Sequence, residues 1–213
     1  MNRYLHSCNN DSRKAMTLYR KNLKLSQELF TIISCFEVAL RNAIDSHYLA
    51  IHGNNWLQNA ALAGGFYDIR KCFLTKKTIN ETITKLGTSY THSKLVAELG
   101  FGFWRYQFAS HQFRVGGQTL LRILPNKPTS TPVMQYNANF MFNELKRINN
   151  IRNRIAHHDP ICFRSGHSII DTSYVNQHYQ DILRFFSWMD INERDLLYGL
   201  DKVSNVIHDI NNL

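Results

Sequence analysis

Residues 151–160, with the sequence IRNRIAHHDP, combine side chains that bind phosphate with side chains that transfer protons. Arg152 carries a permanent positive charge, and a guanidinium group holds a phosphate through two hydrogen bonds. His157 and His158 titrate near neutral pH, so either imidazole can take up or release a proton. Asn153 adds an amide that can orient a histidine or a phosphate. A phosphate clamp beside proton carriers is the chemistry that RNA cleavage by a 2′-hydroxyl requires.

The spacing of these residues limits how they can act together. In an ideal α-helix, Asn153 and His157 are four residues apart and lie on one face, as do Arg154 and His158. Arg152 and His157 are five residues apart, which places them roughly 140° apart around the axis. They meet only if the arginine swings back, if the last turn distorts, or if a second copy of the helix supplies one group. A simpler role also remains open, in which the histidines interact with the negative end of the helix dipole.

Helices are expected to position these residues, because apolar side chains recur at steps of three and four. One helix is predicted from about Asn137 to about His157, with Pro160 as the stop signal. A longer helix is predicted from its cap at Ser12 to about His52. The apolar stripes are Met141, Leu145, Ile148, Ile151 and Ile155 in the first, and Leu25, Leu29, Ile32, Phe36, Leu40 and Ile44 in the second.

The remaining segments also favour helices joined by loops, without a convincing run of strands. The sequence therefore predicts one all-α domain over residues 1–213. Aromatic side chains in the segment GFGFW are expected to enter the core. The expected segments are a loop at 54–66, a helix at 67–86 with Ile69, Phe73, Ile79, Ile83 and Leu86 inward, a short helix from a cap at Ser93 to Leu99, the GFGFW segment at 100–104, a proline-rich loop at 125–133, and helices at 173–190 and 192–210.

Composition and charge favour a folded chain with a polyanionic partner. Hydrophobic residues make up 44% of the 213 residues, which is enough for a core and excludes wholesale disorder. The formal net charge of +9 favours RNA or DNA as a partner, although a merely basic protein has the same charge. Basic residues at helical spacing near the start are candidates to follow an RNA backbone, or form a solvated face; they are Arg13, Lys14, Arg20, Lys21 and Lys24.

The cysteines and histidines lack the spacing of a metal site, so neither a metal nor a cofactor is expected. The cysteines are expected to be reduced thiols, with Cys35 buried on an apolar helix face. The first 14 residues contain no apolar run typical of a signal peptide. No stretch approaches the ~18 apolar residues of a membrane span, so we expect a cytoplasmic protein without a membrane partner.

Three segments resemble the HEPN superfamily (higher eukaryote and prokaryote nucleotide-binding domains), and more narrowly its Abi-like (abortive-infection) branch, found in bacterial defence systems. The run Arg152-Asn153-x-x-Ala156-His157-His158 resembles the Arg-x4-His motif of the superfamily. Residues 36–44 (FEVALRNAI) resemble the first conserved helix of the branch, and residues 100–104 resemble its FGFW-type segment. The three matches follow the family's order and extend over about residues 25–165.

The resemblance implies a HEPN-like helical bundle with additional helices, which forms a homodimer through its motif helices. It also implies metal-independent endoribonuclease activity, with products that end in a 2′,3′-cyclic phosphate and a 5′-hydroxyl, in an antiphage or toxin system. Some relatives carry a tyrosine, to which a nucleotide is attached, two residues after the motif histidine. That position is Asp159 here, so regulation by this modification is not expected. The matching catalytic positions are Arg152, Asn153, His157 and His158, with Glu37 and Arg41 as supporting positions and Arg154 as a further RNA contact.

Three functions remain open from the sequence. The first is the ribonuclease, acting on tRNA or another structured RNA and controlled by an antitoxin or an RNA regulator. The second is a non-catalytic RNA-binding module, which would bind RNA in a salt-sensitive way without cleaving it. The third is a dimeric interaction module of a defence system, in which Arg152→Ala would change assembly instead of RNA chemistry.

Overall fold

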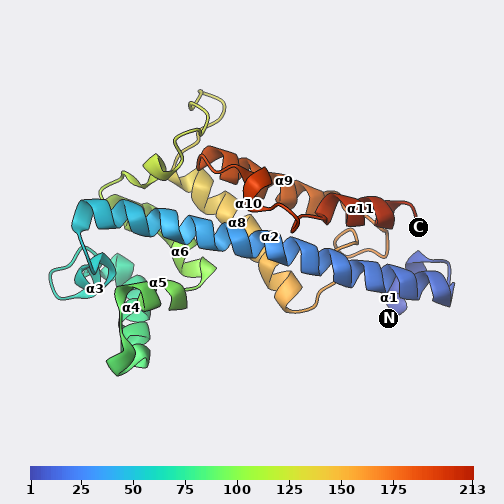
Figure 1. The fold of residues 1–213 in the computed structure, drawn as a ribbon, viewed down its shortest axis with the longest axis horizontal. Coiled ribbons are helices and arrows are strands. Elements are labelled where there is room, and N and C mark those ends of the chain that lie inside the picture. The colour runs from blue at the N-terminus through green and yellow to red at the C-terminus, as the bar shows by residue number, and fades with distance from the viewer. The chain divides into compact units, whose positions relative to one another are not determined.

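The computed structural model describes residues 1–213 and is all-helical, which confirms the predicted all-α class. It contains eleven α-helices, and a single isolated β-bridge joins Phe163 to Ile170. The chain divides into two compact units, which we call unit 1 (residues 1–36 and 147–213) and unit 2 (residues 37–146). Figure 1 shows the order of the elements along the chain. None of the helices combines the length and apolar character that a membrane span requires.

Unit 1 is a bundle that contains both the start of the chain and its C-terminal third. Phe36 packs against Phe185 and Phe186, with ring centroids 5.8 and 5.6 Å apart. An ion pair of 3.1 Å joins Lys21 to Asp209. The Thr172 hydroxyl donates to Asn211 at 2.9 Å, and the Tyr179 hydroxyl donates to Asp201. Together these contacts show that α9 (Ser173–Trp188) runs in the same direction as α2 (Ser12–His52), whereas α11 (Val203–Asn211) runs in the opposite one (Figure 1). The elements are α1 (Asn2–Ser7), the first part of α2 (Ser12–His52), the end of α8 (Ala138–Ala156), α9 (Ser173–Trp188), α10 (Glu193–Leu196) and α11 (Val203–Asn211).

The apolar stripes predicted for the two long helices are buried. Every side chain of both stripes is at most 8% exposed. At the observed burial each such side chain contributes about 1.5–3 kcal/mol relative to exposure. The predicted bounds of α2 and α8 agree with the structure to within one residue, apart from the cap of α2. That cap is Asp11 instead of Ser12, because the Asp11 carboxylate accepts the N–H groups of Arg13 (2.9 Å) and Lys14 (3.0 Å).

Unit 2 is built from short helices around aromatic side chains. Tyr48, Trp56, Tyr67 and Phe108 are fully buried in it. Asp45 fixes the end of α2, because its Oδ1 accepts the indole N–H of Trp56 at 2.7 Å. The elements are the remainder of α2, α3 (Trp56–Ala61), η1 (Arg70–Cys72), α4 (Phe73–Leu86), η2 (Gly87–Ser89), α5 (His92–Glu98), α6 (Phe101–Tyr106), α7 (Ser110–Val115), η3 (Leu120–Ile123) and the start of α8.

The prediction for residues 54–86 was wrong in two ways. The expected loop at 54–66 contains α3, whose side chains are buried at Trp56, Leu57, Ala60 and Ala61. The helix expected from residue 67 begins at Phe73, because residues 62–69 first fold back against α3. At Gly65 a Cβ atom would lie 2.3 Å from the Asn59 carbonyl oxygen, so this close approach requires glycine. Ile69 and Phe73 are consequently exposed instead of inward.

Other boundaries also differ from the prediction. The cap of α5 is Thr91 instead of Ser93, because the Thr91 hydroxyl accepts the N–H of Lys94 at 3.2 Å. The GFGFW segment opens α6, with Phe101 and Trp104 buried as expected, whereas Phe103 is only half-buried. The helix expected at 192–210 is two helices, α10 and α11, separated by a turn in which Gly199 has a φ of +74°. All cysteines are free, and Cys35 is half-buried instead of buried.

Candidate functional site

The motif helix α8 ends in the hydrogen-bonding pattern of a Schellman motif. Its last helical residue is Ala156. The N–H of His158 donates to the carbonyl of Ile155 at 3.0 Å, and the N–H of Asp159 donates to that of Arg154 at 2.8 Å. This pattern requires a left-handed residue, which is usually glycine. His158 occupies the position with a φ of +58°, so the second motif histidine sits at a strained backbone position.

The last turn of α8 remains regular as far as His157. The N–H of His157 donates to the carbonyl of Asn153 at 2.9 Å, as in an uninterrupted helix. Arg152 and His157 therefore keep their separation of roughly 140° around the axis. The backbone departs from the helix only at His158, so distortion of the last turn does not bring Arg152 to His157 within one chain.

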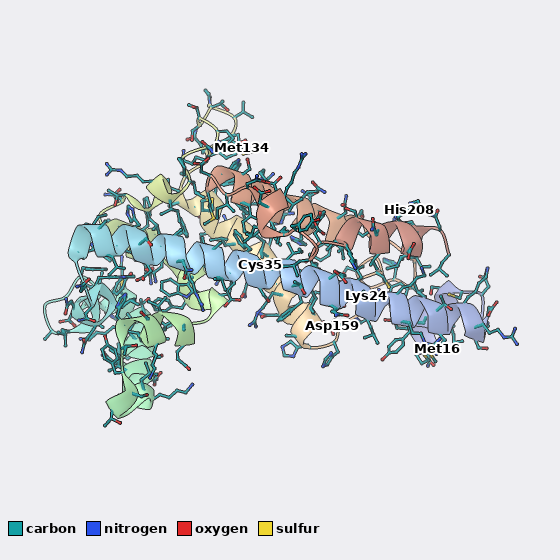
Figure 2. The ribbon with its side chains drawn as sticks, in the orientation of Figure 1. Met16, Lys24, Cys35, Met134, Asp159 and His208 are labelled. Atoms are coloured by element: carbon teal, nitrogen blue, oxygen red, sulfur yellow. The ribbon has the colours of Figure 1, made fainter.

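The motif side chains differ in their exposure. Asn153, His157 and His158 are exposed to solvent. Arg152 is half-buried, and its Nε is shielded from solvent without a hydrogen-bond partner. Figure 2 shows Asp159, which directly follows the histidines, in the turn after α8. The motif thus presents two exposed imidazoles at the helix end and, on another side of the helix, an Arg152 whose Nε has no hydrogen-bond partner.

The segment that follows the motif is fixed to α2 through Asn22. The side-chain oxygen of Asn22 accepts the N–H groups of Ile161 (2.9 Å) and Cys162 (3.1 Å). Asn22 lies between buried side chains of α2 and is only 3% exposed. A buried amide that satisfies two buried N–H groups holds the segment in place, because any other arrangement would leave those groups unpaired.

Helix α1 fixes the same segment through Arg3. The guanidinium of Arg3 donates to the carbonyl oxygens of His167 (2.9 Å) and Arg164 (2.7 Å). It also lies over the ring of Phe163, 4.6 Å from the centroid. Two residues from the first third of the chain, Arg3 and Asn22, therefore both support the segment beyond the motif.

Arg154 has a positioning role within the motif. Its Nη2 donates to the carbonyl of Pro160 at 2.9 Å, across the turn that ends α8. Its guanidinium lies 5.3 Å from the ring centroid of Tyr174 on α9. RNA contact through Arg154 stays a prediction, since these interactions show only that it joins the motif turn to α9.

A buried polar layer on α9 lies next to these contacts. His178 is 1% exposed, and neither ring nitrogen has a hydrogen-bond partner. Burial, with a further contribution from Arg147, lowers the pKa of His178 to about 4. Asp181 accepts from Arg184 at 2.8 Å and pairs with Arg147 at 3.6 Å. The histidine is therefore neutral at physiological pH, whereas the carboxylate is balanced by arginines.

The predicted supporting residues Glu37 and Arg41 lie on α2 in unit 2. Both are half-buried, and the Nε of Arg41 is shielded without a hydrogen-bond partner. At i,i+4 spacing the two side chains could form an ordinary surface ion pair, but the orphaned Nε of Arg41 does not support one. Their role at the site stays a prediction.

The basic residues at the start of α2 are only partly available to RNA. Arg13, Lys14 and Arg20 are exposed. Lys21 pairs with Asp209 at 3.1 Å, and Lys24 pairs with Glu28 at 2.7 Å. An RNA that follows this face would compete with two existing ion pairs. Arg13, Lys14 and Arg20 therefore remain the better candidates for contact with RNA.

Sequence reasoning missed the residues that hold the motif turn. Asn22 carried a local signal, because it interrupts an apolar stripe at a position that a core residue would occupy. Arg3 and Tyr174 carried none, since Arg3 binds carbonyl oxygens more than 160 residues away and Tyr174 contacts Arg154 of another helix.

No group of three or more histidine, cysteine, aspartate or glutamate side chains is arranged to hold a metal ion. The candidate site consists of Arg152, Asn153, His157 and His158, together with the residues that hold the turn after α8. No protein-family model, curated protein or solved structure matches the chain.

Proposed function

We propose that the chain is an endoribonuclease of a bacterial antiphage or toxin system, which cleaves RNA through its own 2′-hydroxyl without a metal ion. The observation that carries the proposal is the exposed end of α8, where His157 and His158 follow the half-buried Arg152. The strained φ of +58° at His158 supports it, because a side chain kept where glycine fits better favours a functional role.

In the proposed reaction, His157 takes the proton from an RNA 2′-hydroxyl. The 2′-oxygen then forms a bond to the adjacent phosphorus, and the bond from phosphorus to the 5′-oxygen breaks. A second imidazole, from His158 or from His157 of a second copy, donates a proton to the leaving 5′-oxygen. The products end in a 2′,3′-cyclic phosphate and a 5′-hydroxyl. General acid–base assistance of this kind is worth ~10²–10⁴-fold in rate.

Arg152 has the electrostatic part of the proposed mechanism. Negative charge accumulates on the phosphoryl oxygens as the 2′-oxygen attacks, and a guanidinium stabilises it. The Nε of Arg152 lacks a partner in the free chain, so an approaching phosphate would satisfy it. Asn153, exposed on the face of His157, would orient the histidine or the phosphate.

A second copy of the chain would complete the site. Since α8 is regular through His157, Arg152 and His157 point to different sides of one helix. Two motif helices that pair would supply an arginine from one copy and a histidine from the other. Mixing Arg152→Ala with His157→Ala subunits tests this arrangement: a shared site predicts that two inactive variants regain part of the activity, whereas no recovery in a confirmed mixed dimer contradicts it.

The central test is RNA digestion in EDTA by the purified chain. The wild type is expected to cleave, and His157→Ala is expected to lose at least ~10²-fold in rate. His6→Ala is the matched control, because His6 is another exposed histidine of unit 1, outside the motif. Cleavage that survives His157→Ala, or that disappears in EDTA, would overturn the proposal.

A further inference from the structure

A cavity of about 580 Å³ adjoins the motif within unit 1. Asp159 and Pro160, which directly follow the two motif histidines, form part of its lining. Its volume lies in the range of about 300–1,000 Å³ that is typical of small-ligand sites. Its lining residues include Arg3, Arg154, Asp159, Arg164, Asp171 and Tyr174.

Of the three arginines, Arg164 alone has both terminal nitrogens left for a ligand. Arg3 donates to loop carbonyls, and Arg154 donates to Pro160. The Nε of Arg164 donates to Asp171 at 3.3 Å, which leaves both terminal nitrogens of Arg164 without a partner in the chain. The Arg164 side chain is 59% exposed. A guanidinium oriented in this way can hold a phosphate through two hydrogen bonds.

The acidic residue beside Arg164 is held in its charged form. Asp171 accepts from the hydroxyl and the N–H of Ser173, and these bonds together with Arg164 lower the pKa of its carboxyl group. Asp171 therefore orients Arg164, and its charge is compensated by the Arg164 guanidinium while the two Ser173 bonds stabilise it.

Tyr174 offers an aromatic surface on another wall of the cavity. Its ring is 39% exposed. His178 packs against the ring at 4.4 Å in an edge-on contact, and the Arg154 guanidinium lies 5.3 Å from its centroid. The ring is thus fixed in position with part of its surface open, which is the condition for stacking a nucleobase.

We propose that this cavity binds one nucleotide, with its phosphate on Arg164 and its base against Tyr174. Assigning that nucleotide to the substrate strand, next to the cleaved bond, rests on the proposed function. The cavity then determines which nucleotide lies beside the motif histidines, and so where the RNA is cut.

Binding of a fluorescent 2′-O-methyl oligonucleotide, measured by anisotropy, tests the phosphate contact without cleavage, because the 2′-oxygen is blocked. Arg164→Ala is expected to weaken binding about tenfold and to reduce the slope of log K against log salt by about one. Arg194→Ala is the matched control, since it removes the same charge from an exposed position of unit 1 outside the cavity. Equal affinity of the two variants would overturn the proposal.

Tyr174 is tested separately, in case Arg164→Ala disturbs the loop. Tyr174→Phe keeps the ring and is expected to bind like the wild type, whereas Tyr174→Leu is expected to lose about tenfold in affinity. Thermal melting checks that each variant is folded. Equal binding by folded Tyr174→Leu and Tyr174→Phe would contradict the stacking role.

Free nucleotides distinguish the two sources of the ligand. Displacement of the oligonucleotide by nucleoside monophosphates at equal concentration would assign the cavity to a free nucleotide, and displacement only by oligonucleotides assigns it to an RNA strand. If the wild type cleaves RNA while Arg164→Ala and Tyr174→Leu change neither binding nor the cut position, the cavity assignment fails and the proposed function stands. If the oligonucleotide binds at the cavity but RNA is never cleaved, the proposed function fails and the nucleotide site stands.

Discussion

His92 in unit 2 and the two motif histidines in unit 1 lie in opposite environments. In unit 2, the Nε2 of His92 pairs with Asp45 Oδ1 at 2.8 Å, and its side chain is 15% exposed. In unit 1, His157 and His158 stand in solvent at the end of α8. A histidine whose ring is hydrogen-bonded to a half-buried carboxylate has a structural role, whereas an exposed imidazole can exchange protons with a substrate. Residue type alone therefore does not identify a catalytic histidine.

Charge also differs between the units, and the motif is not in the more basic one. Unit 1 has 13 basic and 10 acidic residues, a net charge of +3, whereas unit 2 has 12 basic and 6 acidic residues, a net charge of +6. Attraction of a polyanion thus does not come mainly from the unit that carries the proposed chemistry. Weak binding of RNA through net charge would depend strongly on the salt concentration, whereas RNA cleavage would depend on a few residues of unit 1.

Removing Asp45 should have the largest effect on stability while sparing the chemistry. Asp45→Ala leaves the buried indole N–H of Trp56 and the ring of His92 without their acceptor. We expect the free energy of unfolding to fall by about 3 kcal/mol, because two bonds to a carboxylate are lost. Urea denaturation measures this loss of stability. The cleavage rate of the folded fraction should stay within about twofold of the wild-type rate. A large loss of rate in the folded fraction would mean that unit 2 takes part in catalysis.

His178 should make unit 1 sensitive to acid. Its pKa is about 4 in the fold against an ordinary value of 6.5, so the folded state favours the neutral ring. The stability that this provides is present above pH 6.5 and is lost as the pH falls toward 4, by about 2–3 kcal/mol. The groups around it are Arg147, Arg154, Tyr174 and Asp181.

Urea denaturation of the wild type and of His178→Leu at pH 7.5 and pH 4.5 tests this dependence, since other titrations cancel in the comparison. The leucine variant should lose less stability on acidification than the wild type. An equal decline in both proteins would show that His178 does not control the acid sensitivity of unit 1.

Asn22 should support the motif turn from within the core of unit 1. Asn22→Ala removes the acceptor of two buried N–H groups, so we expect a loss of about 2 kcal/mol in unfolding free energy. Asn22→Asp, which keeps an acceptor oxygen, is the matched variant and should lose less. Hydrogen exchange at Ile161 and Cys162 should speed up in the alanine variant. Unchanged exchange there would contradict the anchoring role.

The smallest expected effect is a gain in the free energy of unfolding. His158→Gly relieves the left-handed backbone strain at a φ of +58° and should raise the unfolding free energy by about 1 kcal/mol. The same variant should cleave RNA more slowly if His158 contributes to proton transfer. A variant that is both more stable and fully active would show that the imidazole of His158 is not needed.

Features that depend on the spacing of neighbouring residues could be predicted from the sequence, whereas contacts between residues far apart in the chain could not. The stripes of α2 and α8 were predicted correctly because their apolar residues recur within each turn. The anchors of the motif turn were missed because Asn22 and Arg3 reach partners 139 and 164 residues away. The position of His158 in a left-handed turn was also missed, since glycine is the residue that normally predicts it.

The most direct test of the central claim is the chemistry of the cut made in EDTA. One RNA is compared with the same RNA carrying a 2′-deoxynucleotide at the cleaved position. The account predicts a 2′,3′-cyclic phosphate and a 5′-hydroxyl from the first RNA and no cut at that position in the second. Products that end in a 3′-hydroxyl and a 5′-phosphate, or cleavage at the 2′-deoxy position, would contradict it.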